Sequence, residues 1–147
     1  MSRNPFAYLF PESRVVRFFH RQDRAVFFAM VNDLVQSHFA VLDFGAGRGR
    51  QTEVGGRYLR MISIYRERCA KIIGVHIDPI VMQNPVMEEA HVLAPDGKIP
   101  LADASVDLTY CCAVLEHIDK PEQVVSEIAR VLKPGGWFCA WTPTDSR

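Results

Sequence analysis

A short apolar segment that runs directly into alternating glycines is the feature that most constrains how this chain can fold. The apolar residues 39–42 are too few for a helix and predict a buried strand. Asp43 follows them, and then Gly45, Gly47 and Gly49. Glycine lets the backbone turn sharply and lets a ligand approach without a Cβ atom in the way. A strand followed by such a loop predicts a nucleotide-like ligand at the carboxyl end of a parallel sheet.

The glycine spacing bears on which ligand the loop could hold. A dinucleotide fingerprint needs glycine at the first, third and sixth positions, and the sixth position here is Arg50. An oxidoreductase of the NAD type is therefore the weaker hypothesis, although it stays open on these residues alone.

Composition limits the chain to one globular domain. Its 147 residues are 48% hydrophobic, which suits a single core. No apolar run approaches the roughly 20 residues of a transmembrane helix, and no secretory signal is recognisable. The cysteines have no metal-type spacing, so we expect no metal site. We expect them to be reduced thiols in the core of a cytoplasmic protein. They are Cys69, Cys111, Cys112 and Cys139.

The net charge is zero, with 17 basic and 17 acidic side chains. Residues 1–75 nevertheless hold twelve Lys and Arg against six Asp and Glu. This polarity either attracts an acidic partner or reflects solvated faces, and it gives no clear signal for nucleic acid.

Two regions are expected along the chain. Residues 1–39 form a lead-in followed by an amphipathic helix, because apolar residues recur at helical spacing from Ser13 to His38. Residues 40–147 form the ligand-binding domain.

Apolar runs in the second region alternate with helical segments, which predicts parallel βαβ units and an α/β doubly wound sheet. Helices are expected from Tyr58 to Cys69 and from Pro121 to just before Gly135, with a short or irregular crossover in 80–89. Strands are expected at 39–42, 72–77, 91–93, 107–113 and 137–141.

Several segments together resemble class I S-adenosylmethionine-dependent methyltransferases. The Asp-x-Gly-x-Gly-x-Gly segment from Asp43 resembles the first motif of that family. Segments 99–107, 114–118 and 127–136 resemble later motifs, in the same order and spacing. The resemblance implies a mostly parallel Rossmann-like sheet, S-adenosylmethionine as cofactor and methyl transfer to an acceptor, most simply a small molecule.

The resemblance also implies roles for residues of the first motif. Gly45, Ala46 and Gly47 would bring backbone N–H groups against the methionine part of the cofactor. Asp43 would accept a charge-assisted hydrogen bond from the cofactor ammonium or from the loop. A carboxylate that only braces the loop is the alternative for Asp43.

Two further positions are implied after the third and fourth strands. Asp96 lies where the family bonds the adenine amino group, although Asp96-Gly97 could equally be a plain turn. Ala113 would line the site through its backbone at the carboxyl end of the fourth strand.

One position departs from the family pattern. The family has an acidic residue for the ribose hydroxyls at the end of the second strand, where this chain has His76. Asp78 would share a strand face with His76 and could substitute for it. Otherwise cofactor binding is weakened, and a non-catalytic methyltransferase-like domain is the alternative function.

His117 is a weak candidate for a catalytic base, since a histidine titrates near neutral pH. A structural hydrogen bond is the alternative role. Relatives continue beyond the fifth strand, so we expect this chain to lack the last strands of the family fold. The fifth strand would then expose an apolar edge that favours self-association.

Overall fold

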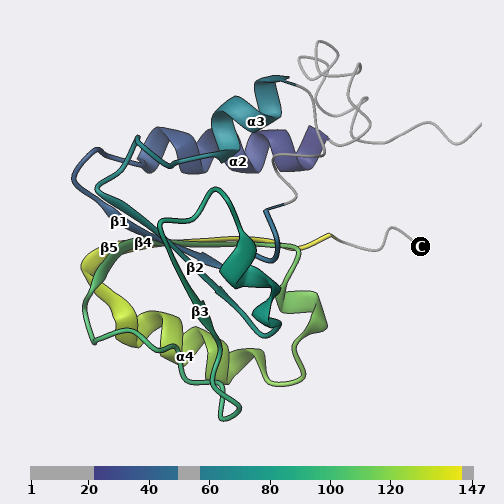
Figure 1. Ribbon diagram of the computed structural model, residues 1–147, viewed down its shortest axis with the longest axis vertical. Helices are drawn as coiled ribbons and strands as arrows, with labels where there is room; N and C mark the ends of the chain where they lie inside the picture. Colours follow the sequence, from purple (N-terminus) through teal and green to yellow (C-terminus); the bar gives the residue numbers. More distant parts are fainter. Residues whose placement is uncertain (1–21, 50–56, 144–147) are drawn as a thin grey trace, which may run out of the picture.

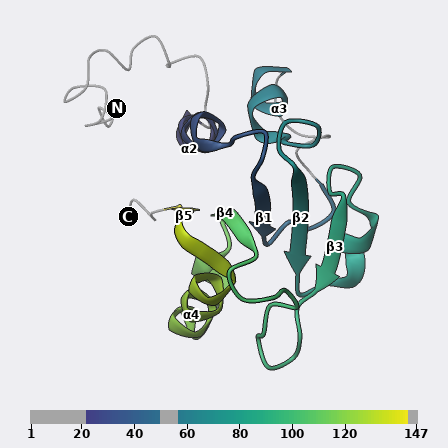
Figure 2. The same cartoon turned by 90° about the vertical axis from the view of Figure 1, so that its left-hand side faces the viewer.

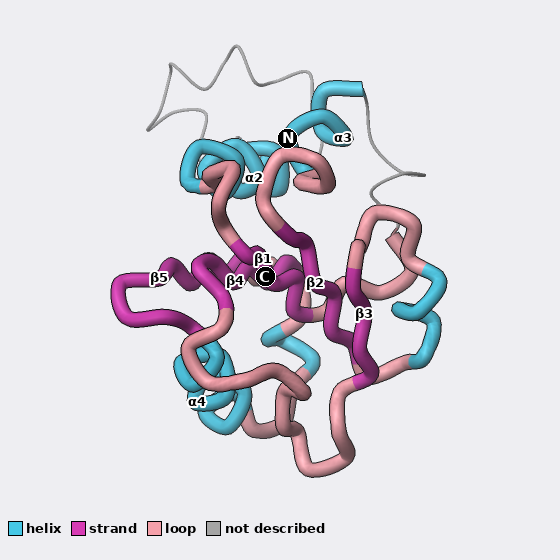
Figure 3. Tube along the Cα trace, turned by 60° about the vertical axis from the view of Figure 1, so that its left-hand side comes forward, coloured by secondary structure: helices cyan, strands magenta, loops and turns pink. Residues whose placement is uncertain are grey.

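The computed structural model describes residues 22–49 and 57–143, which form a five-stranded parallel sheet of order β3-β2-β1-β4-β5. Figures 2 and 3 show β1 in the middle, with β3 and β5 at opposite edges. The predicted doubly wound α/β sheet is confirmed. The strands are β1 (Ala40–Phe44), β2 (Lys71–His76), β3 (Glu89–Val92), β4 (Val106–Cys112) and β5 (Leu132–Trp141).

Helices cover both faces of the sheet (Figure 1). One face carries α2 (Gln22–Leu34) and α3 (Arg57–Ser63), and the other carries α4 (Pro121–Val131). Two short 3-10 helices, η3 (Pro79–Gln83) and η4 (Leu115–His117), follow β2 and β4. Within the described ranges, no helix has the length and apolarity needed to span a membrane.

Alternating side chains of the strands divide the core into two layers. On β1, Val41 packs in the layer beneath α2 and α3, whereas Leu42 and Phe44 pack in the layer against α4. Successive strand residues point to opposite faces, so a strand covered on both sides reads as a continuous apolar run. This burial explains why the central strands were recognisable from the sequence.

The first strand is longer than predicted. It continues through Asp43 to Phe44, because Asp43 pairs with Gly74 of β2 and Tyr110 of β4. A carboxylate is depleted in strands, so the sequence favoured an end at Leu42. The sheet ladder overrides that preference.

Two helices end earlier than the apolar spacing indicated. The helix expected to reach His38 ends at Leu34, and the one expected to reach Cys69 ends at Ser63. Val35, Phe39 and Ile64 lie beyond these ends yet still pack on the same core, which prolongs the apolar pattern. The expected helical residues before Gln22 lie outside the described part.

The last helix and strand meet without a loop. The short crossover is confirmed as η3, and α4 begins at Pro121 as predicted. However, β5 starts at Leu132 rather than at Trp137, since Leu132 already pairs with Val106 and a bulge follows in the β4 register.

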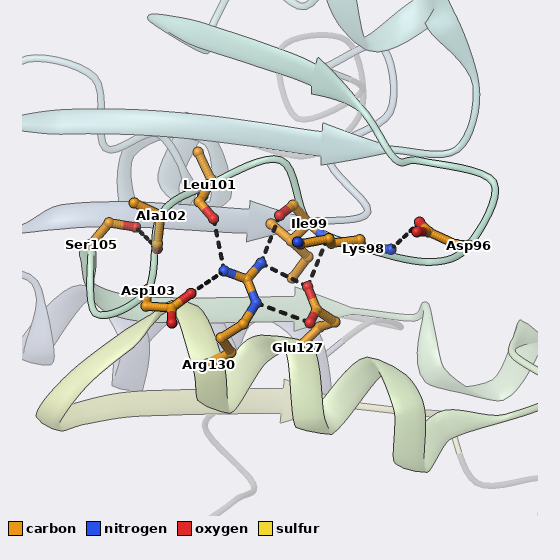
Figure 4. A network of polar contacts seen from close by, with 9 residues as sticks. All are labelled: Asp96, Lys98, Ile99, Leu101, Ala102, Asp103, Ser105, Glu127 and Arg130. Carbon is orange, nitrogen blue, oxygen red and sulfur yellow. Dashed lines mark hydrogen bonds and ion pairs between the residues drawn. The ribbon is translucent and has the colours of Figure 1, made fainter.

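Arg130 of α4 holds the segment that leads into β4 (Figure 4). Its guanidinium donates to the backbone carbonyls of Ile99 and Leu101 at 2.8 and 2.9 Å. It also pairs with Glu127 and Asp103, and the bond from Arg130 lowers the pKa of the Glu127 carboxyl. Glu127 in turn accepts from the Ile99 amide at 2.9 Å. One side chain thus satisfies two carbonyls and two carboxylates.

We expect Arg130→Met to lower the free energy of unfolding by about 2 kcal/mol, because it leaves the partly buried partners of the guanidinium without their hydrogen bonds. Lys133→Met is the control. Its ion pair with Asp107 lies on a side chain that is 44% exposed, so its loss should cost below about 1 kcal/mol. Urea denaturation measures the free energy of unfolding of both variants. Equal losses of stability in the two variants would contradict a special role for Arg130.

Candidate functional site

The glycine loop lies where the chain order of the sheet reverses. β1 is flanked by β2 on one side and by β4 on the other, and all three strands run parallel. Their carboxyl ends therefore meet at one edge, where doubly wound folds form ligand crevices. Residues 45–49 and the residues after Cys112 share that edge.

The first turn of the loop is tied to β2. The backbone amides of Gly45 and Ala46 donate to the Val75 carbonyl at 2.7 and 3.2 Å. The sheet edge therefore already engages these two amides, and their approach to the cofactor stays a prediction. The Gly47 amide has no partner among the residues that the structure describes.

Each of the three loop positions requires glycine for a different physical reason. A Cβ on Gly45 would lie 2.3 Å from a methyl of Val114, and one on Gly49 would lie 2.6 Å from Oδ1 of Asn84. These two glycines allow close packing. At Gly47, with φ +54°, a Cβ would meet, among the described residues, only the Gly45 carbonyl oxygen at 4.0 Å. Gly47 thus presents an open surface as well as an amide.

Asn84, which the sequence analysis missed, braces this loop from below. Its side-chain nitrogen donates to the carbonyls of Ala46 and Gly47, both at 3.1 Å. Asn84 precedes a proline in a segment that reads as irregular, and no periodic pattern marks it. Only the contact across the fold reveals its role.

Asp43 lies beneath the loop rather than in it. Its side chain is buried, 3% exposed, and accepts a hydrogen bond from the Tyr110 hydroxyl at 2.9 Å. Burial raises the pKa of Asp43 from its ordinary 3.8 to about 7, while the bond from Tyr110 opposes this rise. Tyr110 packs edge-on against Phe28 and Tyr65, which hold its ring in place. The sequence did not single out Tyr110.

Ala113 stands at the carboxyl end of β4 in a strained conformation. Its φ is +58°, a left-handed value that an alanine seldom adopts, and its amide donates to the Trp141 carbonyl at 2.8 Å. Such outliers gather at ligand sites, where the surrounding structure holds them. The side chain of its neighbour Val114 lies against Gly45, so Ala113 stands next to the glycine loop, and its contact with a cofactor stays a prediction.

His76 and Asp78 separate at the end of β2. His76 is the last strand residue, whereas Asp78 caps η3 and accepts from the Ile80 amide at 2.8 Å. The two therefore do not share a strand face, and that expectation is wrong. The strand ends at His76, and after two intervening residues η3 begins at Pro79.

Asp96 forms a turn. Its carboxylate accepts from the Lys98 amide at 3.0 Å, and Gly97 has φ +80°. Both residues line an open groove of about 390 Å³ with Glu122 and Ser126 of α4. The structure thus places Asp96 at this groove, and its contact to adenine stays a prediction.

His117 lies in η4 with its side chain 77% exposed, 3.8 Å from a Glu116 carboxylate oxygen. Its role as a catalytic base stays a prediction.

Comparison with known proteins identifies the family. The model of a methyltransferase domain family matches residues 42–140, and the chain belongs to the class I S-adenosylmethionine-dependent methyltransferases. An uncharacterized methyltransferase of Mycobacterium sp. (strain JLS) is 32% identical over 111 residues, covering 74% of this chain and 43% of the relative. One from Mycobacterium leprae is 32% identical over 130 residues, covering 80% and 45%. The chain thus spans less than half the length of these curated relatives.

Solved structures share the fold. The YcgJ protein of Bacillus subtilis superposes with a TM-score of 0.59 at 20% identity, covering 78% of this chain and 49% of its own. A SAM-dependent methyltransferase from Aquifex aeolicus gives a TM-score of 0.53 at 22% identity, covering 83% and 67%.

Buried Asp43 should make stability depend on pH. In the folded chain the Asp43 carboxyl keeps its proton up to about pH 7, whereas an unfolded aspartate releases its proton at about pH 4. Folding therefore takes up a proton between these values, so stability should fall as pH rises from about 4 to about 7 and then level off.

Urea denaturation across this pH range measures the slope, and Asp43→Asn should flatten it. Other groups also contribute to the pH dependence of stability, so the difference in slope between the wild type and Asp43→Asn is the relevant quantity. Parallel curves for both proteins would contradict the assignment to Asp43.

Proposed function

We propose that this chain binds S-adenosylmethionine at the carboxyl edge of β1 and β4 and transfers its methyl group to a small-molecule acceptor. The observation that carries the proposal is Gly47, whose amide and open surface lie at the reversal point of the sheet. The residues fit the cofactor: an N–H donor faces the loop surface, and strained Ala113 borders the same edge. Family membership supports the reaction type.

The bound cofactor would supply a methyl group on a sulfonium, already activated for displacement. The chain would then contribute mainly positioning, which can account for a large part of the rate. Gly47 would hold the methionine part, Asp43 would brace the loop or meet the ammonium, and Asp96 would meet the adenine. His117 remains a candidate base for an acceptor that must lose a proton.

A second function is a methyltransferase-like domain with weakened cofactor binding and no turnover. Its support is His76 at the ribose position, together with Asp78 engaged in capping η3. No observation favours the NAD-type oxidoreductase, and family membership argues against it.

Gly47→Val tests the cofactor site, with Gly135→Val as the matched control. Both glycines have positive φ, and no side chain of residues 22–49 or 57–143 lies within 4 Å of the added Cβ, so both variants should lose about 1–2 kcal/mol of stability from strain. Only Gly47→Val should abolish S-adenosylmethionine binding in calorimetry, because its branched side chain would occupy ligand space. Unchanged affinity in this variant would refute the site.

His76→Asp tests the ribose position. An ionised carboxylate accepts from two hydroxyls, whereas a neutral imidazole offers one acceptor. We expect S-adenosylmethionine to bind more tightly by about 1 kcal/mol, the scale of one net hydrogen bond. Asp78→Asn is the control and should leave the affinity unchanged; weaker binding by His76→Asp would mean that histidine is itself a ligand.

We also propose that the 147-residue chain self-associates through β5. Within residues 22–49 and 57–143, β5 pairs with β4 alone, and Trp137 on it is 51% exposed. An apolar strand edge is a template for another chain. Light scattering should show self-association of the wild type, which Trp137→Lys should reduce. A strictly monomeric wild type would rule out this proposal.

The cytoplasmic location remains a prediction.

A further inference from the structure

Both ends of the Asn84 side-chain amide form hydrogen bonds at the base of the glycine loop. The side chain is 7% exposed, and its nitrogen donates to the Ala46 and Gly47 carbonyls. Its oxygen accepts from the Val86 amide at 3.1 Å. Two acceptors on one side and a donor on the other fix which end of the amide is nitrogen.

These two bonds determine which way the loop peptides face. In a trans peptide the C=O and the following N–H point in opposite directions, and the described residues contain no cis peptide. Because the Ala46 carbonyl points at Asn84, the Gly47 N–H points away from it. The Gly47 carbonyl is likewise turned inward, so neither oxygen faces the open side of the loop.

The loop therefore presents a donor where it could have presented acceptors. The amides of Gly45 and Ala46 are bound to Val75, which leaves Gly47 to serve an outside ligand. A carboxylate is repelled by an outward carbonyl and attracted by an outward N–H, and such bonds to ionised groups are strong. Asn84 decides between these two arrangements.

The third glycine of the loop is explained by the same residue. A Cβ on Gly49 would lie 2.6 Å from Oδ1 of Asn84 and 3.1 Å from the Pro85 ring. Gly49 thus allows the loop to close over the amide that braces it.

We propose that Asn84 is a positioning residue for the carboxylate of the cofactor's amino-acid end. It acts by holding two loop carbonyls inward, so that the Gly47 N–H is directed at the ligand. The inference rests on the proposed cofactor site and goes beyond it, since it assigns a role to a residue outside the glycine motif.

Two ligands separate this role from a general structural one. S-adenosylhomocysteine carries the amino-acid end, whereas methylthioadenosine has the same nucleoside and sulfur without it. Asn84→Asp keeps the shape but replaces the donor by an acceptor facing two carbonyls. We expect this variant to bind S-adenosylhomocysteine more weakly by about tenfold, with methylthioadenosine little changed.

Val81→Ala is the matched control. Val81 is fully buried in η3, close in sequence to Asn84, and its truncation leaves a cavity without touching the loop bonds. In this control, the ratio of the affinity for S-adenosylhomocysteine to the affinity for methylthioadenosine should stay at the wild-type value. Asn84→Ser is a second variant that removes the brace without adding charge, and its ratio should fall as in Asn84→Asp.

The wild-type protein provides a measurement that does not depend on any variant folding. The NMR signal of the Gly47 amide proton should move downfield on adding S-adenosylhomocysteine and stay nearly unchanged with methylthioadenosine. An unchanged ratio of the two affinities in the folded Asn84 variants would overturn the role of Asn84 alone. Equal responses of the Gly47 amide to both ligands would overturn that role together with the assignment of Gly47 to the methionine part. Failure of the wild type to bind either ligand would overturn the proposed function with it.

Discussion

The parallel pairing of β1 between β2 and β4 is the constraint on which the rest of this structure depends. Three neighbouring strands that run in one direction bring their carboxyl ends to one edge. The glycine loop and Ala113 are far apart in the sequence, yet this pairing brings them into contact through Val114. The crossovers on both faces then follow, because each parallel strand needs a connection that returns over the sheet.

Close approach of backbones at that edge leaves its polar groups little access to water, so the protein supplies their partners. Val75 accepts two loop amides, and Asn84 donates to two loop carbonyls. Unpaired groups at such a place would each cost about 1–3 kcal/mol. These bonds hold the loop, and they give the Gly47 N–H a defined direction, which favours the binding of a small charged ligand.

Asp43 illustrates a conflict between stability and the needs of a site. A carboxylate in the apolar layer beneath α2 and α3 opposes folding when ionised, and Tyr110 offsets only part of this cost. The surrounding aromatic rings of Phe28 and Tyr65 are needed to keep the Tyr110 hydroxyl in place. A residue that weakens the core in this way is a frequent sign of function.

The sequence by itself determined the class of fold, the order of its elements and the loop that carries the candidate site. Apolar runs and glycines report burial and backbone freedom, which are local properties. Tertiary structure alone decided where helices end, since Val35 and Ile64 pack in the core without being helical. Tertiary structure also decided why glycine is needed at each of the positions 45, 47 and 49. It likewise gave Tyr110 and Asn84 their roles, because these depend on contacts between residues distant in the chain.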